Sequence, residues 1–312
     1  MSRPAEPPSK VNLLPLSQGT KDTRSAWRHR LAQWIEPSVL LGPTGLWLLL
    51  LMVLPILLIL EISLVPGLRP GQATTGYGLG NYLQILQPTY LKVLWRSMTF
   101  ATGTTGLCLV LGFPVAYWLA LMAPKRWRNF LLVVFILPLW TSSLLRTYAW
   151  ITLLRPSGLI NLVLSSLGLP TQDLMNTTGA VFIGMSYSFL PYMVLILYAS
   201  LEKLDLQLLE AAADLGANPR VAFWRVTVPQ TLPGIAAGGL LVFVTSLGDF
   251  VVPALLGGPS SMTISRLIYN QFLGISRNWG FGSALSMVLI MAVSLAIALL
   301  LRYGDRNPEG FS

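Results

Sequence analysis

Long apolar runs separated by polar segments dominate the chain. Each run is long enough, as a helix rising about 1.5 Å per residue, to cross a hydrocarbon core of roughly 30 Å. Backbone groups in lipid must be hydrogen-bonded within a helix, so each run is predicted to be a membrane-spanning helix. The six predicted spans are residues 39–63, 93–121, 129–154, 178–200, 231–256 and 279–301.

The polar segments complete the predicted domain organisation. Residues 1–38 are expected to form a cytoplasmic tail followed by an amphipathic helix over 24–36, whose tryptophans lie at the membrane surface. An extension of the disordered tail is the alternative for this segment. Residues 39–301 form the transmembrane domain, and 302–312 a second cytoplasmic tail. Loops are predicted at 64–92, 155–177 and 257–277, the first two with a short helix each.

Basic residues set the predicted orientation. The chain carries 21 Lys and Arg against 12 Asp and Glu, although only 11% of its residues are charged. Fourteen of the 21 lie in the tails, in the turn at 124–128 and in the polar segment at 201–233, all on one side of a six-span protein. The positive-inside rule places that side in the cytoplasm. The basic balance therefore indicates membrane topology and no nucleic-acid partner.

Residue content excludes several kinds of chemistry. The single cysteine, Cys108, lies in an apolar run and the single histidine, His29, in a basic segment, so no disulfide framework or Cys/His metal cluster is expected. No G-x-x-x-x-G-K-[S/T] phosphate loop and no Ser/His/Asp or paired-carboxylate constellation stands out. The chain is therefore predicted to be no enzyme by itself, and ATP-driven transport would need an ATPase on another subunit.

A polar, helix-forming segment separates the fourth and fifth predicted spans, and we call its residues 201–229 the elbow. Asp205 is a predicted N-cap, and the alanine-rich helix that follows is predicted to end where Gly216 takes the left-handed conformation. Four apolar side chains share one face of this helix at helical spacing: Leu204, Leu208, Ala211 and Leu215.

A second elbow helix is predicted to begin with Asn218 as N-cap and Pro219 as first helical residue. Pro229 is expected to end or kink it. The small side chains at 211–213 would let another backbone approach closely, so the elbow is interpreted as a docking surface. An ordinary cytoplasmic loop is the alternative that these residues leave open.

The elbow resembles the EAA loop of ABC importer permeases. Glu210-Ala211-Ala212 is followed after three residues by Gly216, and after nine more by Val226-Thr227-Val228-Pro229, with valines replacing the isoleucine and leucine of the family pattern. The resemblance implies that the elbow sits in a groove of an ATP-binding subunit and acts as a mechanical joint. The residues to which it gives this coupling role are Glu210, Ala211, Ala212, Asp214, Gly216, Ala217, Arg220, Phe223 and Pro229.

Asp249 is the candidate residue of the substrate pathway. It falls inside the predicted fifth span, where a carboxylate is costly and usually faces a pathway or a paired charge. Gly248 and Pro253 beside it indicate a broken helix whose free backbone groups line a cavity. We expect Asp249 to meet a cationic substrate or to shape the gate. The alternatives are a structural pair with Arg146 and a helix end nearer to water.

Aromatic side chains could complete a cation site, because an aromatic face attracts an ammonium group. The candidates lie on the third and fourth predicted spans and beside the acid: Trp140, Tyr148, Tyr187, Tyr192 and Phe250. Tyrosine and tryptophan also gather at membrane interfaces without binding substrate, which is the alternative for each of them. Arg146 is an opposite signal, since it would favour an anionic substrate.

The stretch SLGDFVVPALLGGPSSMTISRLIYNQF around Asp249 resembles the spermidine/putrescine-type permeases of the importer family. This resemblance implies an all-α membrane protein with six transmembrane helices of the type I ABC importer permease (MetI-like) fold, in the bacterial cytoplasmic (inner) membrane. It implies polyamine cargo, a periplasmic or lipid-anchored solute-binding protein, and two ATPase subunits that hold the ATP and magnesium, with no cofactor on this chain. It favours a second permease that is a different chain.

Several alternatives share part of this pattern. Related permeases for iron, sulfate, thiamine, opines or amino acids resemble the same stretch. An ion-coupled secondary transporter and a non-transporting membrane scaffold or receptor subunit are rivals from other classes, and neither of them requires the elbow.

Overall fold

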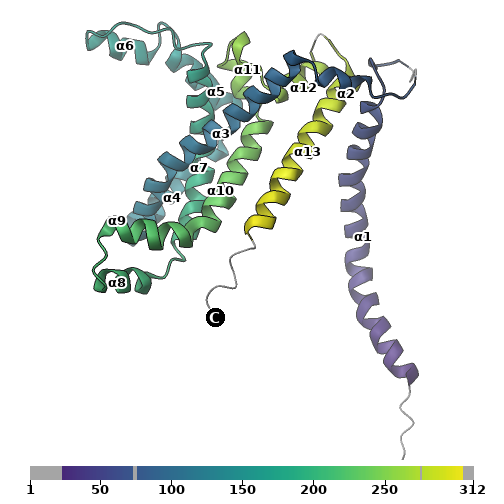
Figure 1. Cartoon of the computed structure of the whole chain (residues 1–312), viewed down its shortest axis with the longest axis horizontal. Coiled ribbons are helices and arrows are strands. Elements are labelled where there is room, and N and C mark those ends of the chain that lie inside the picture. The colour runs from purple at the N-terminus through teal and green to yellow at the C-terminus, as the bar shows by residue number, and fades with distance from the viewer. Residues whose placement is uncertain (1–22, 73–75, 275, 305–312) are drawn as a thin grey trace, which may run out of the picture. The chain divides into compact units, whose positions relative to one another are not determined.

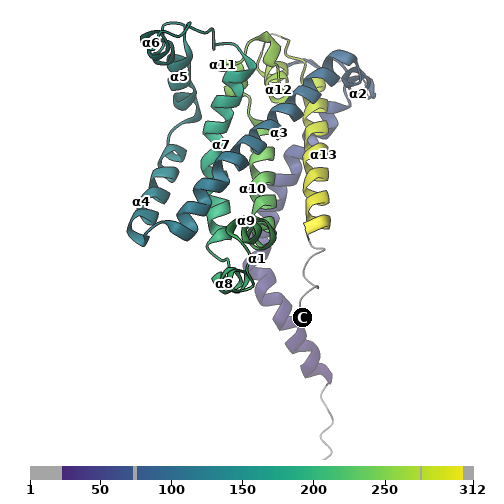
Figure 2. The same ribbon diagram turned by 60° about the vertical axis from the view of Figure 1, so that its left-hand side comes forward.

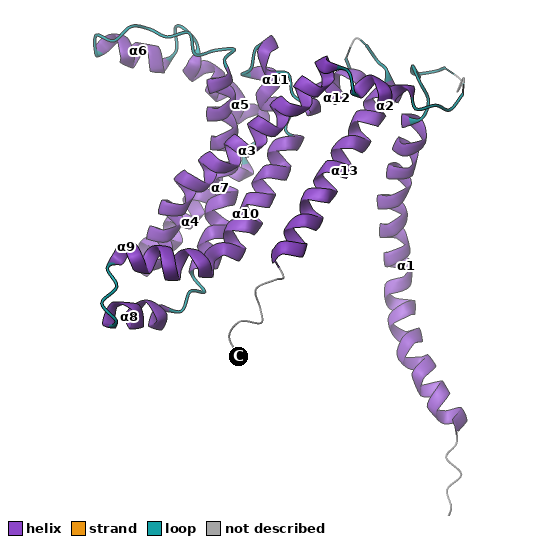
Figure 3. Cartoon of the chain, viewed as in Figure 1, coloured by secondary structure: helices purple, strands orange, loops and turns teal. Residues whose placement is uncertain are grey.

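The computed structural model describes residues 23–72, 76–274 and 276–304, without the side chains of 23–41, 299–301, 303 and 304. Every regular element in these ranges is a helix, and loops or turns join them (Figure 3). The expected all-α architecture is therefore confirmed for the described residues. The chain separates into two units, Met1–Leu57 and Leu58–Ser312, and each is described by itself.

The first unit contains most of helix α1 (Thr23–Ser63). This helix is continuous over 41 residues, so the amphipathic segment predicted at 24–36 and the predicted first span belong to one helix. Gly42–Ser63 is long and apolar enough to cross a membrane, with a mean hydropathy of 2.6. The side chains of the predicted amphipathic face lie outside the described residues, so that face stays a prediction.

Three long helices form the centre of the second unit and lie side by side (Figure 1). They are α3 (Pro88–Tyr117), α7 (Thr178–Leu201) and α10 (Val228–Gly248). The last helix of the described residues is α13 (Trp279–Gly304). Small residues allow close packing between them. A Cβ on Gly112 of α3 would lie 3.3 Å from Met193 of α7, and a Cβ on Gly234 of α10 would meet Ser200.

The third predicted span, 129–154, is not a single helix. It is divided into α4 (Lys125–Ile136), the 3-10 turn η2 (Leu137–Trp140) and α5 (Ser143–Leu154). The two parts, Lys125–Trp140 and Ser143–Ser166, are bent by 95°. Thr141 and Ser142 have extended backbone at the break, and the Thr141 hydroxyl donates to the carbonyl of Pro138 at 2.7 Å. Such local side-chain bonds to freed backbone groups make a break within an apolar run tolerable.

Short helices cover opposite ends of the second unit (Figure 2). One end carries α2 (Gly80–Ile85), α6 (Leu159–Ser166), α11 (Val251–Leu255), η4 (Pro259–Ser261) and α12 (Ile264–Phe272). The other end carries α8 (Leu206–Asp214) and α9 (Pro219–Ala222). The π-helical turns η1 (Trp118–Met122) and η3 (Phe223–Thr227) follow α3 and α9. Helices α2 and α6 confirm the two short helices predicted in the loops.

Five helices among the described residues are long and apolar enough to cross a membrane: Gly42–Ser63, Pro88–Met122, Thr178–Leu201, Pro219–Gly248 and Trp279–Ala298. The bent pair makes a sixth when it counts as one span. The predicted spans and these candidate helices have similar bounds except in two places. The third is broken, and the fifth is shifted so that it ends at Gly248 instead of residue 256.

Candidate functional site

The first elbow helix, α8, is capped at both ends. The Asp205 carboxylate accepts a hydrogen bond from the Gln207 N–H at 2.9 Å, which confirms the predicted N-cap. At the other end Gly216 has a φ of +81°, and the N–H groups of Gly216 and Ala217 donate to carbonyls of the last turn at 2.9 and 3.0 Å. This pair of bonds is a Schellman motif, so the predicted glycine stop is also confirmed.

The apolar face predicted for α8 is mostly left open. Leu204, just before the helix, is buried, whereas Leu208 is 48% exposed and Leu215 is 89% exposed. Leu209, which lies off the predicted face, packs against the bundle core instead. Large apolar side chains exposed together in a polar elbow are typical of a surface that another protein covers.

The second elbow helix continues without interruption into the fifth span. The Asn218 side chain accepts from the Val221 N–H at 2.9 Å, and Pro219 is the first helical residue, as predicted. Helix α9, the π-helical turn η3 and α10 together form one helix of 30 residues, Pro219–Gly248. Pro229 was predicted to end or kink the elbow helix. The helix does not end there, but the π-helical turn directly before Pro229 is a local irregularity in it. Pro229 lies in the first turn of α10, directly after a π-helical turn, where its missing N–H is tolerated.

Most of the coupling residues named from the sequence lie on the elbow surface. A cavity of about 440 Å³ between α8 and α9 is lined by Ala212, Gly216 and Ala217, together with Leu215 and Val221. Four of the others are exposed around the turn and on the two helices: Glu210, Ala211, Asp214 and Arg220. The structure thus brings small, apolar and charged residues with a predicted coupling role together on one accessible surface.

Phe223 has a different place from the other coupling residues. Its ring packs edge-on against Phe113 and Tyr117 of α3, with centroid distances of 5.6 and 5.7 Å. Phe223 therefore holds the elbow against the helix bundle, and it does not face the open surface. Pro229 is exposed but belongs to the start of α10.

A polar cluster at the start of the elbow was not recognised from the sequence. Arg128 of α4 donates to the carbonyl of Ala120 at 2.8 Å, and its Nη1 lies 3.8 Å from Oε1 of Glu202. The same carboxylate oxygen accepts a hydrogen bond from the Tyr198 hydroxyl at 2.8 Å. The cluster joins the elbow to the turn between the second and third spans. Its one signal in the sequence is the basic turn at 124–128, and basic residues there indicate topology without naming an acidic partner.

Asp249 lies at the break that ends the fifth span. Its backbone is extended, and its Oδ1 accepts hydrogen bonds from the N–H groups of Val251 at 2.9 Å and Val252 at 3.4 Å, at the start of α11. The predicted broken helix is confirmed, but the helix ends at Gly248, so the prediction that Asp249 falls inside the fifth span is wrong. The structure shows the alternative of a helix end, because the apolar stretch after Asp249 forms a separate short helix.

Arg146 of α5 is near Asp249 but does not form an ion pair with it. Its helix α5 packs against α11, the short helix that begins two residues after Asp249. Among the described residues, however, the only ion pair within 4.0 Å joins Arg128 and Glu202. Nε and Nη1 of Arg146 are buried, and no acceptor among the described residues forms a hydrogen bond with them. The structural pair considered from the sequence is therefore absent in this conformation.

The aromatic candidates do not converge into a single cage. Tyr187 of α7 contacts Trp150 of α5 with ring centroids 5.5 Å apart, and Tyr192 is half-buried against the core. Trp140 and Tyr148 are 86% and 56% exposed and make no ring contact with the other candidates among the described residues.

Phe250 is the candidate that lies beside Asp249 with an aromatic partner. Its ring stacks on Tyr269 of α12, with centroids 4.7 Å apart and planes 13° from parallel. Tyr269 was missed from the sequence because it lies in another helix, and no spacing rule connects it to Phe250. The helix break at Asp249 therefore has one stacked aromatic pair, Phe250 and Tyr269, beside it.

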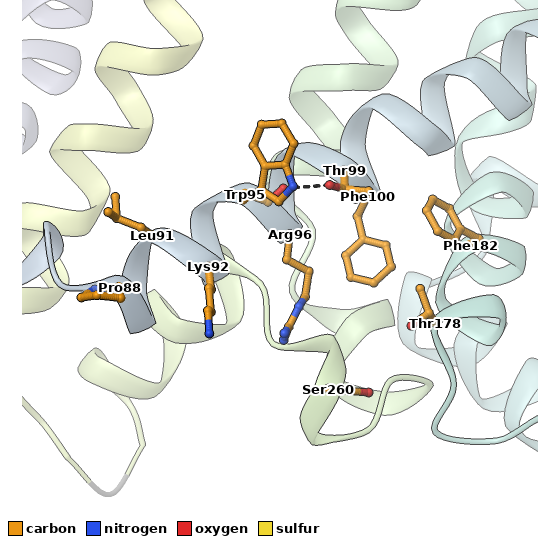
Figure 4. Close-up of a pocket in the computed structure, with 10 residues that line it drawn as sticks. All are labelled: Pro88, Leu91, Lys92, Trp95, Arg96, Thr99, Phe100, Thr178, Phe182 and Ser260. Carbon is orange, nitrogen blue, oxygen red and sulfur yellow. Dashed lines mark hydrogen bonds between the residues drawn. The ribbon is translucent and has the colours of Figure 1, made fainter.

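A cavity of about 660 Å³ lies at the end of the second unit remote from the elbow (Figure 4). Its lining contains Lys92 and Arg96 but no acidic residue. A cationic solute would be repelled there, so this cavity does not extend the acidic site at Asp249.

Comparison with known proteins agrees with these features. The model of the family "Binding-protein-dependent transport system inner membrane component" matches residues 112–304. The spermidine/putrescine transport system permease protein PotB of Haemophilus influenzae is 40% identical over 260 residues, which cover 82% of this chain and 90% of that protein. PotB of Escherichia coli K12 is 41% identical over 258 residues, covering 82% and 93%. The molybdenum transport system permease protein ModB of Mycobacterium bovis is 30% identical over 229 residues, covering 72% and 83%.

Solved structures show the same fold. A chain of a bacterial ABC transporter that imports the acidic polysaccharide alginate superposes with a TM-score of 0.71, covering 91% of this chain and 100% of that one, at 20% identity. A chain of the methionine ABC transporter MetNI superposes with a TM-score of 0.52, covering 72% and 96%, at 15% identity. The alginate transporter has also been solved in complex with a periplasmic protein that holds an alginate pentasaccharide. The chain belongs to the family of binding-protein-dependent transport system inner membrane components, and it is the multi-pass permease subunit of an ABC importer.

Proposed function

We propose that this permease imports a small organic polycation of the polyamine class. Relatives that are 40% and 41% identical over 82% of the chain carry the name of spermidine and putrescine transport. The acidic helix break at Asp249 supports the same cargo, because it offers a carboxylate to an ammonium group. The alginate and methionine transporters support the fold alone, since they are 20% and 15% identical.

The observation that carries the mechanism is the continuity of the helix Pro219–Gly248. Its 30 residues correspond to a length of about 45 Å, with the elbow at one end and Asp249 directly after the other. Two copies of the ATPase, holding ATP and magnesium, would dock on the elbow. When ATP draws them together, a displacement of the elbow would move the break at Asp249. The pathway would then change from outward-facing to inward-facing.

The geometry at Asp249 suits a cation. Its Oδ1 is held by backbone N–H groups, and no hydrogen bond from the described residues reaches Oδ2, which remains available to an ammonium group. The neighbouring rings of Phe250 and Tyr269 offer a face worth roughly 0.5–2 kcal/mol to a cation. In this proposal four further aromatic residues line the pathway: Trp140, Tyr148, Tyr187 and Tyr192.

The proposed assembly has a second permease that is a different chain. Both termini and the elbow face the cytoplasm of the bacterial cell, in keeping with the basic residues on that side. The end that carries α6, α11 and α12 then faces away from the cytoplasm. A periplasmic or lipid-anchored solute-binding protein would deliver the substrate there.

Uptake of radiolabelled spermidine and putrescine tests the role of Asp249. Asp249→Asn retains an oxygen that can accept from Val251 and Val252, so the start of α11 is preserved while the charge is lost. We expect uptake to fall to background with the amount of assembled complex unchanged. The matched control is Asp173→Asn, which removes an exposed acid from a loop and should leave uptake intact. Normal polyamine uptake by Asp249→Asn would remove this residue from the site.

A second candidate cargo is a small anion. It is favoured by the unpartnered nitrogens of Arg146 and by the 30% identical relative named for molybdenum transport. In that case Arg146→Gln should abolish uptake, Asp249→Asn should spare it, and polyamines should fail to stimulate the ATPase of the reconstituted complex.

A further inference from the structure

The cavity remote from the elbow is open to one side and is lined by three separate parts of the second unit (Figure 4). The first turns of α3 supply one wall, the start of α7 supplies Thr178 and Phe182, and η4 supplies Ser260. Phe100 and Phe182 contact each other with ring centroids 5.1 Å apart, so this wall is a packed aromatic surface. The cavity is therefore built by the tertiary fold.

Positive charge converges on this cavity. Lys92 and Arg96 are one helical turn apart on α3, and Figure 4 shows their side chains on the same side of the helix. No carboxylate of the described residues lies within 4.0 Å of either cation. Neighbouring like charges on one helix face destabilise each other, so the pair gains stability when an anion lies between them.

Two helix N-termini add to the same field. Helix α3 begins at Pro88 and α7 begins at Thr178, and both residues line the cavity. A helix N-terminus carries a partial positive charge that acts over about the first turn, so it gives no support to a cation as close to it as Lys92. The dipole of α3 thus gives no reason for Lys92 at this place, whereas binding of an anion does.

The apolar side chains around the cations indicate what kind of anion fits. Leu91 and Trp95 of α3 line the same cavity and are 45% and 76% exposed. They stand at the beginning of the apolar segment Pro88–Met122, where a tryptophan is typical of the boundary between lipid headgroups and hydrocarbon. A small soluble anion would leave these side chains uncovered, and a polyamine would be repelled.

We propose that this cavity binds the phosphate headgroup of a membrane phospholipid. Lys92 and Arg96 hold the phosphate, and the acyl chains cover Leu91 and Trp95. With the orientation proposed above, the lipid belongs to the leaflet away from the cytoplasm. The bound lipid fixes the start of α3 against α7 and η4. The site is independent of the transported cargo, because it lies apart from Asp249 and has the opposite charge.

Native mass spectrometry of the complete transporter complex, titrated with phosphatidylglycerol, tests the proposal. Wild type is expected to retain the lipid. The double variant Lys92→Gln/Arg96→Gln should bind it more weakly by a factor of roughly ten or more, because two charge-assisted hydrogen bonds are lost. Diacylglycerol, which lacks the phosphate, should bind neither protein measurably. The control Arg69→Gln/Arg155→Gln removes two exposed arginines of the same end and should bind like wild type.

Further arms separate the lipid from other occupants. Equal lipid binding by wild type and the double variant would overturn the proposal. If the double variant binds lipid like wild type but docks the solute-binding protein more weakly, the proposal is also overturned, because the two cations then belong to a protein interface. Displacement of the lipid by millimolar inorganic phosphate would show a site for a free anion only. The exchange variant Lys92→Arg/Arg96→Lys must retain the lipid, which excludes a mere folding defect. Lipid binding is measured without substrate, so a failed polyamine assignment would not affect this result.

Discussion

Gly216 is the elbow residue whose backbone conformation is most demanding. Its φ is +81°, and a Cβ added there would meet no atom within 4 Å. Gly216→Ala therefore strains the backbone without any steric clash, at a cost of about 1 kcal/mol. We expect the Schellman turn to open. Because about 1 kcal/mol corresponds to a roughly five-fold change in a binding constant, the affinity for the ATPase should fall by that factor, as measured by titration of ATPase onto the reconstituted permease.

A matched glycine separates conformation from side-chain size. Gly106 of α3 also has open space around it but a helical backbone, so Gly106→Ala should leave ATPase affinity unchanged. Equal effects of the two variants would show that the turn conformation is not what the ATPase recognises.

Single residues differ in how far the sequence reveals their role. Asp205, Gly216 and Asn218 act on backbone groups within three residues of themselves, so their cap positions were predictable from local chemistry. The role of Asp249 was not predictable from local chemistry, because it depends on where the preceding helix ends. Tyr269 could not be found at all, since its contact with Phe250 is purely tertiary.

At the scale of elements, the two misplaced span boundaries have a common cause. The residues after Gly248 and those around Thr141 are as apolar as the helices they follow, and hydropathy cannot distinguish a break from a continuation. What breaks the third and fifth spans is local hydrogen bonding by Thr141 and Asp249. The elbow, in contrast, was located well because its polarity differs from everything around it.

The continuous helix Pro219–Gly248 is expected to work only if it stays stiff. Ala236→Gly/Ala237→Gly in its middle weakens helix propensity by about 1 kcal/mol per residue and leaves both the elbow and Asp249 unchanged. We predict normal ATPase docking and normal ATP hydrolysis, but fewer substrate molecules transported per ATP in proteoliposomes. The same pair of changes in α13, Ala292→Gly/Ala296→Gly, is the control and should preserve the ratio. An unchanged ratio in the α10 variant would show that force reaches the gate by another route, such as the Arg128–Glu202 cluster.

At the scale of the whole molecule, fold and family were accessible from the sequence, whereas the cavity beside Lys92 was not. Six apolar runs and one polar elbow are one-dimensional features, and they define a membrane permease. The cavity needs α3, α7 and η4 in contact, and these segments are far apart in the chain. A cavity of this kind appears only when the helices are packed.

The proposed orientation makes a prediction for the entire chain that two introduced thiols can check. The native thiol, Cys108, is fully buried and should not react with a membrane-impermeant maleimide. Leu167→Cys, at the end of α6, and Leu215→Cys, in the elbow, replace leucines that are 69% and 89% exposed. In intact spheroplasts we expect labelling of Leu167→Cys alone, because the elbow faces the cytoplasm. Permeabilisation should expose Leu215→Cys, and bound ATPase should then slow its labelling by covering the elbow. Labelling of Leu215→Cys in intact spheroplasts would reverse the orientation, and with it the assignment of the elbow as the docking surface for a cytoplasmic motor.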